Sequence, residues 1–521
     1  MQKRREFLQI LGSAVASLAG ASFAHGAAIQ SAQETRARRP RNILFLMCDQ
    51  HNPDVLGRYG DRAAITPSLD ALAASGTSFR QTYCQNPVCV PARNAILLSR
   101  YSHSMGVQTN GQSTPRDLLS LPQYLRAQGF TTGCFGKLHV LGRNDLDWDV
   151  VERAKKVDSA EPPASAAGTQ AAADYVAPKS YFGAPWPFPE TETAEWFAKE
   201  HAIAFLKANR ERPWFIECSM NKPHPPFTPP QRYWDVIDRS KLTIPSYPAD
   251  DLDDVHPRLP ATMVKAGLDH LTDEQALDGM QGYYGNLAFA DAMIGEVLKT
   301  LDALGLREDT LIVYTADHGE MLRHHNLWKK QCFFDQAVRV PLILSWPGAI
   351  AAGRESQAMI EHIDLFPTLV EMLGLEVPEG LQGESFVPVI TGAKKQGRAY
   401  VRSEFYVKEK GAFRPTLMQF DGRYKFIDNG PDVAPELYDR QEDPREITNI
   451  QARPDQRERV ERLTNELRQG MNDDVVAPLP PESAKKKPVS AAKGAKKKTT
   501  ATGKNGSKGL GKNGESAEDG E

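Results

Sequence analysis

Two continuous apolar segments, each followed by an acidic residue, constrain the fold of this chain most strongly. Residues 42–48 read Asn-Ile-Leu-Phe-Leu-Met-Cys and precede Asp49, and residues 310–316 read Thr-Leu-Ile-Val-Tyr-Thr-Ala and precede Asp317. An apolar run of this length suits a parallel strand that is covered on both faces. Functional groups in open α/β sheets gather just beyond the carboxyl ends of the strands. We therefore expect an α/β fold with Asp49 and Asp317 at its functional edge.

The residues next to these two acids widen the chemistry available at that edge. Gln50 follows Asp49, and His318 follows Asp317. Oxygen ligands of this kind suit a hard divalent cation such as Ca²⁺ or Mg²⁺, and the imidazole extends the choice to Mn²⁺. A single aspartate at a strand end more commonly caps the next helix. Two of them, with an amide and an imidazole beside them, favour a metal site.

The remaining pattern predicts a large, mostly parallel sheet flanked by helices, followed by a small antiparallel sheet with one helix. Further strands of the large sheet are expected at 79–83, 130–136, 213–219 and 340–346, with helices at 66–73, 93–98, 121–128, 195–209, 281–304 and 363–374. Short strands are expected at 400–402, 416–420, 424–427 and 436–439, before a charged helix near 455–469. These elements indicate a main domain at 40–390 and a C-terminal subdomain at 395–474.

Two segments without clear periodicity interrupt the main domain. Residues 150–190 are rich in Ala, Pro and Gly and read as an inserted surface loop, and residues 228–272 are rich in Pro and Asp. Loops carried by a rigid scaffold commonly line binding clefts. We expect both segments to shape the specificity of the site.

The N-terminus has the composition of an export signal. The run Lys3-Arg4-Arg5-Glu6-Phe7-Leu8 precedes an apolar stretch of small residues at 10–24, with possible cleavage points at 24–28. This stretch is too short for a membrane span, which needs about 20 apolar residues. The Arg-Arg-x-Phe-Leu pattern resembles a twin-arginine signal. Residues 1–28 therefore predict a periplasmic or extracellular protein with no transmembrane span after their removal, and an uncleaved N-terminal anchor is the alternative.

The C-terminal tail, residues 475–521, differs in charge from the rest of the chain. The formal net charge is -3, but residues 484–521 hold ten lysines and four acids among Ala, Gly, Ser and Thr. Such a segment cannot bury a core, so we expect it to be disordered. A solvated tail is the simpler interpretation, and a tether to an anionic polymer or surface is the functional one. The overall charge gives no reason to expect nucleic-acid binding.

Six cysteines are scattered along the chain with no Cys-x-x-Cys pair, so neither a disulfide scaffold nor a zinc ribbon is expected. The most specific surroundings belong to Cys89, in the run Cys89-Val90-Pro91-Ala92-Arg93. Pro91 marks a turn, and 93–98 reads as the start of a buried helix, so Cys89 lies at a loop-to-helix junction. Free N–H groups and the helix dipole favour bound negative charge there. The alternatives are a sulfur nucleophile aimed at an anion and a buried structural cysteine.

This run resembles the Cys-x-Pro-x-Arg maturation signature of the type I sulfatases, in the alkaline phosphatase-like superfamily. Further motifs similar to those of the family follow in the family's order, over about residues 42–450. They are Gly136-Lys137-Leu138-His139, Pro223-His224-Pro225-Pro226, Asp317-His318-Gly319-Glu320 with Trp328-Lys329-Lys330 downstream, and Leu437-Tyr438-Asp439-Arg440-Gln441-Glu442-Asp443-Pro444. Several motifs in one order are far more specific than any one of them. The resemblance implies an alkaline phosphatase-like fold and hydrolysis of a sulfate ester to alcohol and sulfate.

The resemblance also implies a modified residue and a cation. A separate formylglycine-generating enzyme would oxidise Cys89 to formylglycine, whose hydrate attacks the sulfur with one hydroxyl and expels sulfate with the other. One divalent cation, with Ca²⁺ preferred to Mg²⁺ or Mn²⁺, would be held by Asp49, Gln50, Asp317, His318 and the modified Cys89. It would polarise a sulfate oxygen and the attacking hydroxyl, and Asp317 would take the proton from that hydroxyl.

Five further residues receive roles from the same resemblance. Arg93 would orient the formylglycine, and His139 would support its hydrate. Lys137, His224 and Lys330 would hold the sulfate oxygens and neutralise charge in the transition state. Either His224 or Lys330 would protonate the leaving alcohol.

Two assignments in the segment after Asp317 depend on spacing alone. Lys330 is preferred to its neighbour Lys329 because it follows Trp328 with the spacing of the family's Trp-x-Lys pattern. His325 stands where the family often has a histidine, which implies a supporting role.

Three positions depart from the common family pattern. Leu98-Ser99 replaces the Thr-Gly that helps the maturation enzyme recognise some members, Ala92 stands where many members have serine, and Gln50 stands where aspartate is common. Phosphonate monoester hydrolases resemble the chain at Ala92 and Gln50. We therefore expect an exported sulfatase, with a sulfated polysaccharide as one candidate substrate. The alternatives are a phosphonate or phosphate ester hydrolase with the same formylglycine, and a non-catalytic binder of sulfated glycans in which Cys89 stays a thiol.

Overall fold

An eight-stranded sheet forms the centre of the molecule, with the strand order β4-β3-β5-β1-β6-β7-β2-β8. The computed structural model describes residues 39–143, 147–154, 164–167, 169–170, 181–409 and 412–473. The strands of this sheet are β1 (Asn42–Asp49), β2 (Thr77–Tyr83), β3 (Thr131–Gly136), β4 (Val150–Glu152), β5 (Trp214–Pro223), β6 (Thr310–Ala316), β7 (Arg339–Ser345) and β8 (Arg354–Glu361). β7 is antiparallel to β6 and β2, and the other neighbouring pairs are parallel. The predicted mostly parallel sheet is confirmed.

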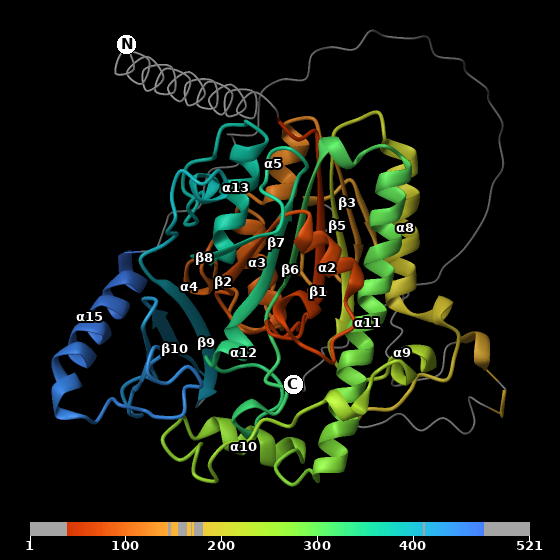
Figure 1. Ribbon diagram of the computed structural model, residues 1–521. Helices are drawn as coiled ribbons and strands as arrows, with labels where there is room; N and C mark the ends of the chain where they lie inside the picture. Colours follow the sequence, from red (N-terminus) through yellow and green to blue (C-terminus); the bar gives the residue numbers. More distant parts are fainter. Residues whose placement is uncertain are drawn as a thin grey trace, which may run out of the picture.

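Helices cover both faces of this sheet, and Figure 1 shows α8 and α11 lying together along one of them. Ile43, Phe45 and Met47 of β1 pack into one hydrophobic core, and the alternate residues Leu44, Leu46 and Cys48 pack into another. The first core includes α3 (Cys89–Leu98), α5 (Leu121–Ala127) and α13 (Leu365–Met372), and the second includes α2 (Pro67–Ala74), α8 (Ala194–Asn209) and α11 (Asp273–Ala303). Burial on both faces explains why β1 reads as a continuous apolar run.

The C-terminal part forms a separate four-stranded antiparallel sheet in the order β12-β11-β10-β9. Its elements are β9 (Val401–Glu409), β10 (Ala412–Phe420), β11 (Tyr424–Asp428), β12 (Glu436–Asp439) and α15 (Arg457–Asp473). Leu463 and Leu467 of α15 pack on this sheet. Lys425 of β11 lies 2.6 Å from Asp335 Oδ1, and this buried ion pair joins the small sheet to the main domain. The predicted antiparallel sheet with one helix is confirmed.

Short helices lie in the connections between these elements. They are α4 (Ser102–Met105), α9 (Gln231–Asp235), α10 (Arg258–Ala266), α12 (Asp335–Val338) and α14 (Val387–Ile390). α9 and α10 lie within the segment 228–272, so that segment is partly helical. In Figure 1 they lie at the same end of the molecule as the first turns of α11.

The structure corrects several predicted boundaries. α11 begins at Asp273 rather than at 281, because Thr272 and Gln275 form a capping box that starts the helix earlier. α3 begins at Cys89, so Pro91 lies inside its first turn, where a missing backbone N–H costs little. The prediction of a surface loop over all of 150–190 is wrong at its start, because β4 pairs with β3 at the edge of the sheet.

The predicted signal at 1–28 and tail at 475–521 lie outside the described residues. Among the helices that the structure describes, none is both long enough and apolar enough to cross a membrane.

Candidate active site

Asp49 and Asp317 lie side by side at the carboxyl edge of the central sheet. β1 and β6 are adjacent and parallel, with Cys48 opposite Ala316, so the next residue of each strand reaches the same edge. Both carboxylates are fully buried. The chain turns at Gln50, which has a φ of 66°, and the backbone N–H of Gln50 donates to Asp317 Oδ1 at 3.1 Å. Strand register alone therefore brings the two predicted acids together.

Cys89 faces these acids from the first residue of α3, a helix in which all residues are buried. Its Sγ lies 3.2 Å from His318 Nε2, 3.8 Å from Asp49 Oδ1 and 3.9 Å from Lys330 Nζ. The predicted loop-to-helix junction at Cys89 is confirmed. The helix N-terminus and the lysine both favour negative charge at this position.

Four of the predicted metal ligands form one cluster. Asp49, Cys89, Asp317 and His318 offer ligand atoms that all lie within 4.8 Å of one another. Because the carbonyl oxygen of Gly319 only accepts, His318 Nδ1–H donates to it at 3.0 Å, and Nε2 is the nitrogen left for a metal. Two buried carboxylates and one imidazole suit a divalent cation. The donor set therefore fits the cation that the sequence implies.

Gln50, the fifth predicted ligand, is held between two charged groups. Its Oε1 accepts from Lys330 Nζ at 2.7 Å, and its Nε2 donates to Glu320 Oε2. The structure thus brings the amide oxygen of Gln50 to the lysine that also contacts Cys89.

Arg93 joins the two acids. Its Nε donates to Asp317 Oδ2 at 2.8 Å and its Nη2 donates to Asp49 Oδ2 at 3.1 Å. Its Nη1 donates to the carbonyl oxygen of Lys137 and, at 2.9 Å, to Ser219 Oγ. These hydrogen bonds go to the acids, to the residue that follows β3 and to β5, so Arg93 fixes the carboxylates in place.

Three cationic or basic side chains surround Cys89 and Asp49. Lys137 Nζ lies 2.9 Å from Asp49 Oδ2, and His224 Nε2 lies 4.0 Å from Asp49 Oδ1. Lys330 is buried, whereas the side chains of Lys137 and His224 are 17% and 16% exposed. The site therefore opens to solvent on the side of Lys137 and His224.

The two acids differ in proton affinity. Burial alone would raise the pKa of Asp49, but the charges of Lys137 and Arg93 hold that pKa well below its usual range. Burial and the charge of Asp49 raise the pKa of Asp317 to about 6. Asp49 is thus the permanent anion, and Asp317 is the acid that takes a proton more readily.

The same cations act on Cys89 and His224. Burial and Asp49 tend to raise the pKa of the Cys89 thiol, yet Lys330, Lys137 and His318 bring it well below its usual value. Burial, with Lys330 and Lys137, lowers the pKa of His224 and leaves its ring neutral. Because His224 Nδ1–H donates to the carbonyl oxygen of Pro225 at 2.7 Å, Nε2 carries the lone pair. His224 therefore needs a proton before it can donate to an anionic ligand.

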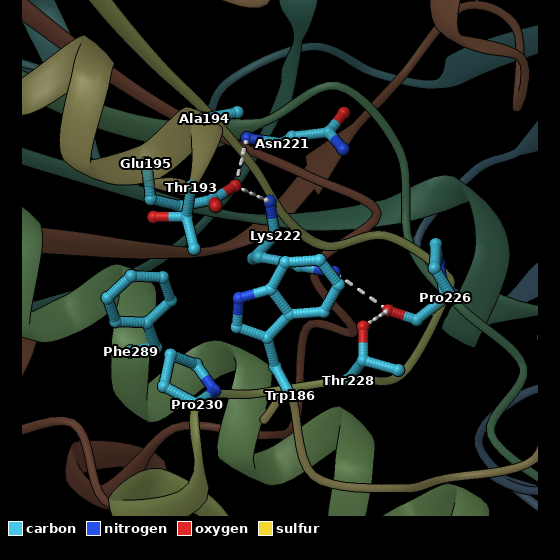
Figure 2. A pocket seen from close by; sticks show the side chains of 10 residues that line it. All are labelled: Trp186, Thr193, Ala194, Glu195, Asn221, Lys222, Pro226, Thr228, Pro230 and Phe289. Atoms are coloured by element: carbon cyan, nitrogen blue, oxygen red, sulfur yellow. Dashed lines mark hydrogen bonds between the residues drawn. The ribbon is translucent and has the colours of Figure 1, made fainter. Parts of the chain in front are cut away.

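The loop that carries His224 is braced on the side shown in Figure 2. Glu195 of α8 accepts from the backbone N–H groups of Asn221 at 3.2 Å and Lys222 at 3.0 Å. Lys222 Nζ donates to the carbonyl oxygen of Pro226 at 2.8 Å and so closes the loop across His224. These groups line a pocket together with Trp186. The position of His224 is thus fixed by contacts outside the cluster of acids.

Two buried glutamates belong to the site although the sequence pattern assigns them no role. Glu320 accepts from the backbone N–H groups of Leu322 at 3.1 Å and Lys329 at 2.7 Å, and burial raises its pKa to about 7. Glu217 of β5 lies 3.9 Å from Arg93 Nη1, and burial raises its pKa to about 7. The sequence does contain a signal for each of them. Glu217 is an acid within the apolar run 213–219, and Glu320 follows Asp317 closely in the sequence.

Two histidines with predicted supporting roles are not joined to Cys89 by a hydrogen bond in the described part of the chain. His139 has a φ of 48°, and its Nδ1 has no hydrogen-bond partner among the described residues. His325 Nδ1 lies 3.0 Å from Asp251 Oδ2, and its ring stacks on Phe334 at 3.7 Å. His325 therefore anchors its own loop rather than the cluster of acids.

The two lysines after Trp328 point to different places. Lys330 Nζ contacts Gln50 and Cys89. Lys329 Nζ lies 5.6 Å from the centre of the Tyr181 ring. The structure brings Lys330, the lysine that spacing favours, to the site.

Comparison with known proteins agrees with the geometry. The family model described as Sulfatase matches residues 41–375. The chain belongs to the sulfatase family. A second model, described as N-sulphoglucosamine sulphohydrolase, C-terminal, matches residues 323–473. The predicted alkaline phosphatase-like fold and the predicted class, sulfuric ester hydrolase, are confirmed at this level.

Relatives of this sulfatase include enzymes named for different esters. Choline-sulfatase from Rhizobium meliloti is 27% identical over 434 residues, which cover 79% of this chain and 83% of that protein. N-acetylglucosamine-6-O-sulfatase from Bacteroides thetaiotaomicron is 25% identical over 491 residues, which cover 80% and 84%. A solved structure, phosphonate monoester hydrolase SpPMH from Silicibacter pomeroyi, is similar with a TM-score of 0.73 and 25% identity, covering 83% of this chain and 95% of that one.

Proposed function

We propose that this sulfatase hydrolyses its sulfate ester through a formylglycine made from Cys89. The main support is the position of Cys89 Sγ, 3.2 Å from His318 Nε2 and 3.8 Å from Asp49 Oδ1, beside groups that suit a cation. A hydrated aldehyde at this position would supply one hydroxyl for attack on sulfur and a second for release of sulfate. The thiol of Cys89 has no second group of this kind.

Asp49, Asp317 and His318 would hold one divalent cation, with Gln50 Oε1 as a further oxygen ligand. We favour Ca²⁺ because most of these ligands are oxygens, and the imidazole leaves Mg²⁺ and Mn²⁺ as alternatives. The cation would polarise a sulfate oxygen. Asp317 binds a proton more readily than Asp49, so it is the acceptor for the proton of the attacking hydroxyl.

The side chains at the open side of the site would bind and protonate the substrate. Lys137 and Lys330 supply charged N–H donors for the sulfate oxygens. A sulfate ester bound beside His224 adds a negative charge, which raises the proton affinity of Nε2. The protonated ring can then donate to the leaving alcohol, and Lys330 is the alternative donor. Arg93 holds the two acids throughout. His139 would support the hydrate through Nδ1, which has no hydrogen-bond partner among the described residues.

Mass spectrometry of the peptide that contains Cys89 tests this proposal together with hydrolysis of an aryl sulfate. We expect formylglycine at position 89 in protein from the native host, and a loss of at least about 10⁴-fold in kcat for Cys89→Ala. A thiol on every molecule, with aryl sulfate still hydrolysed, would refute the formylglycine mechanism. A thiol on every molecule, with binding of sulfated glycans but no turnover, would favour the non-catalytic binder.

Hydrolysis of a phosphonate or phosphate ester is the second candidate. Gln50 and the similarity to the phosphonate monoester hydrolase favour it. Aryl sulfate and aryl phosphonate ester, assayed in parallel with one preparation, separate the two candidates. The proposed sulfatase activity requires the larger kcat/KM on the sulfate.

We propose a sulfated carbohydrate as the substrate. The description of the second family model and the N-acetylglucosamine-6-O-sulfatase relative support this class. Rates on defined sulfated oligosaccharides, compared with choline sulfate, test it. A clear preference for choline sulfate would contradict it.

We also propose export through residues 1–28, from the twin-arginine pattern in the sequence. Replacement of Arg4 and Arg5 by lysine should retain the protein in the cytoplasm. Cell fractionation and N-terminal sequencing of the exported protein measure the outcome, and export of the double variant at the normal level would contradict the proposal.

A further inference from the structure

An uninterrupted series of hydrogen bonds runs from the loop that carries Lys330 to Cys89. The backbone N–H groups of Leu322 and Lys329 donate to Glu320 Oε1 at 3.1 Å and 2.7 Å. Gln50 Nε2 donates to Glu320 Oε2, and Gln50 Oε1 accepts from Lys330 Nζ at 2.7 Å. Lys330 Nζ lies 3.9 Å from Cys89 Sγ.

The chemistry of the two ends fixes the orientation of the amide between them. An ionised carboxylate only accepts hydrogen bonds, and an ammonium only donates them. Gln50 must therefore present its NH₂ group to Glu320 and its oxygen to Lys330. Gln50 and Glu320 are both fully buried, so water cannot compensate for a mismatch.

We propose that Glu320 is a positioning residue that sets the direction of the Gln50 amide, so that Gln50 Oε1 faces Lys330. This inference rests on the proposed function for the role of the cluster, but its hydrogen-bond geometry is independent of catalysis. Glu320 also closes the loop 321–329 through two backbone donors. It thus places both the amide oxygen and the ammonium at the site.

Glutamine at position 50 matches both of its neighbours in this structure, whereas a carboxylate would match only Lys330. A carboxylate at this position would lie against the carboxylate of Glu320 with no proton between them. Glutamine supplies the donor that Glu320 needs and keeps an oxygen for Lys330. Glutamine at 50 and glutamate at 320 are thus a matched pair.

An exchange of the two residues tests the pairing without a change in size or total charge. In Gln50→Glu, two carboxylates meet. In Glu320→Gln, one donor must face another donor, because the amide at 320 cannot satisfy both its backbone partners and Gln50. In the double variant, the amide at 320 donates to the carboxylate at 50, which still accepts from Lys330. The two hydrogen bonds from the backbone, the one between the side chains of residues 50 and 320, and the one from Lys330 are then all present. Only the one between residues 50 and 320 has its donor and acceptor exchanged.

Asn52 offers a matched control for this exchange. Asn52 Nδ2 donates at 2.7 Å to the backbone oxygen of Glu320 rather than to its carboxylate. Asn52→Asp therefore adds an isosteric buried carboxylate beside the same residue but outside the series of hydrogen bonds. Glu320→Gln should not rescue it.

The four proteins of the exchange are compared at pH 8.5, where a proton shared between two carboxylates is least favoured. The unfolding temperature, measured in the presence of a chelator, reports the interaction of residues 50 and 320 in the absence of cation and substrate. The kcat/KM on an aryl sulfate reports the effect of the same changes on the active site. We expect each single variant to lose about tenfold or more in kcat/KM and to unfold at a lower temperature. The double variant should exceed both single variants in both measurements.

Losses in unfolding temperature that simply add in the double variant would overturn the proposal. An equal rescue of Asn52→Asp by Glu320→Gln would also overturn it, because the effect would then be one of charge alone. If the parent protein fails to hydrolyse any sulfate ester, the proposed function fails, while the unfolding measurements still decide the pairing of Gln50 and Glu320.

Discussion

Replacement of Lys330 by methionine removes the ammonium group that contacts both Cys89 and Gln50, and it keeps most of the side-chain volume. The ammonium lies 3.9 Å from Cys89 Sγ and 2.7 Å from Gln50 Oε1, and Lys330 is 6% exposed. Charge that develops on a group bound at Cys89 in the transition state is therefore within direct reach of Lys330.

The distance sets the expected size of the effect. Two unit charges 3.9 Å apart interact with about 4 kcal/mol at an effective dielectric constant near 20. Since each 1.36 kcal/mol is worth a factor of ten in rate, full loss of this term corresponds to about 10³-fold. Removal of a single preorganised donor in other enzymes costs about 10²–10³-fold in kcat. We therefore expect a loss of about 10²–10³-fold in kcat for Lys330→Met.

The neighbouring Lys329 provides the control. Lys329→Met removes an ammonium 5.6 Å from the Tyr181 ring and leaves the backbone N–H that donates to Glu320. Its kcat should change by less than about threefold, as expected for a cation outside the site. Initial rates on an aryl sulfate over a range of substrate concentrations separate kcat from KM, and circular dichroism verifies folding.

Equal losses in the two variants would refute the assignment of Lys330. A rise in KM with unchanged kcat for Lys330→Met would also refute it, because Lys330 would then bind substrate and transition state equally well.

Three further perturbations test the rest of the site and the core. Arg93→Met leaves Asp49 and Asp317 without their shared cation, so urea titration should show a loss of about 3–5 kcal/mol in the free energy of unfolding; Arg414→Met, at an exposed pair with Asp432, should cost less than about 1 kcal/mol, and similar losses would contradict the reasoning. A chelator should lower both kcat and Tm. Ca²⁺ added at about 100 times its Kd should then raise the free energy of unfolding by about 2.7 kcal/mol. A Tm that responds to neither chelator nor Ca²⁺ would argue against the cation. Burial and His318 lower the pKa of His362 from 6.5 to about 3, so its contribution to stability is present above pH 6.5 and is lost as the pH falls towards 3. His362→Gln keeps a donor for Thr315 Oγ1. Between pH 6.5 and pH 4, the free energy of unfolding of this variant should fall by on the order of 3 kcal/mol less than that of the parent protein. Equal pH profiles of the two proteins in urea titrations would exclude His362 as the source of the pH dependence.

The parts of the fold that sequence reasoning predicts well are those buried on both sides. β1 and β6 read as continuous apolar runs because helices cover both faces of the sheet, and their adjacency places Asp49 and Asp317 together. β8 escapes prediction because it lies at the edge of the sheet and carries polar residues, with the sequence Arg-Glu-Ser-Gln-Ala-Met-Ile-Glu. β4 has only three residues and no usable period.

The site was predictable where a side chain follows a strand or opens a helix, as with His318 and Cys89. Glu320 was not, because its role depends on the path of the loop that follows it. Leu322 and Lys329 reach the Glu320 carboxylate through backbone with positive φ values of 44° and 75°. Residues other than glycine rarely adopt this conformation, so no local preference predicts that the two N–H groups converge.

The complete burial of α3 determines whether modification of Cys89 comes before or after folding. Cys89 is 1% exposed and lies in a helix whose other residues are all buried, so no second protein can grip the segment 89–93 in the folded molecule. To expose it, the fold would have to open in its core, at a cost close to the full 5–15 kcal/mol that typically separates native from unfolded states. Any enzyme that alters Cys89 must therefore reach it during or soon after synthesis. Whether residue 89 is cysteine or formylglycine in the folded protein is then decided before the chain folds.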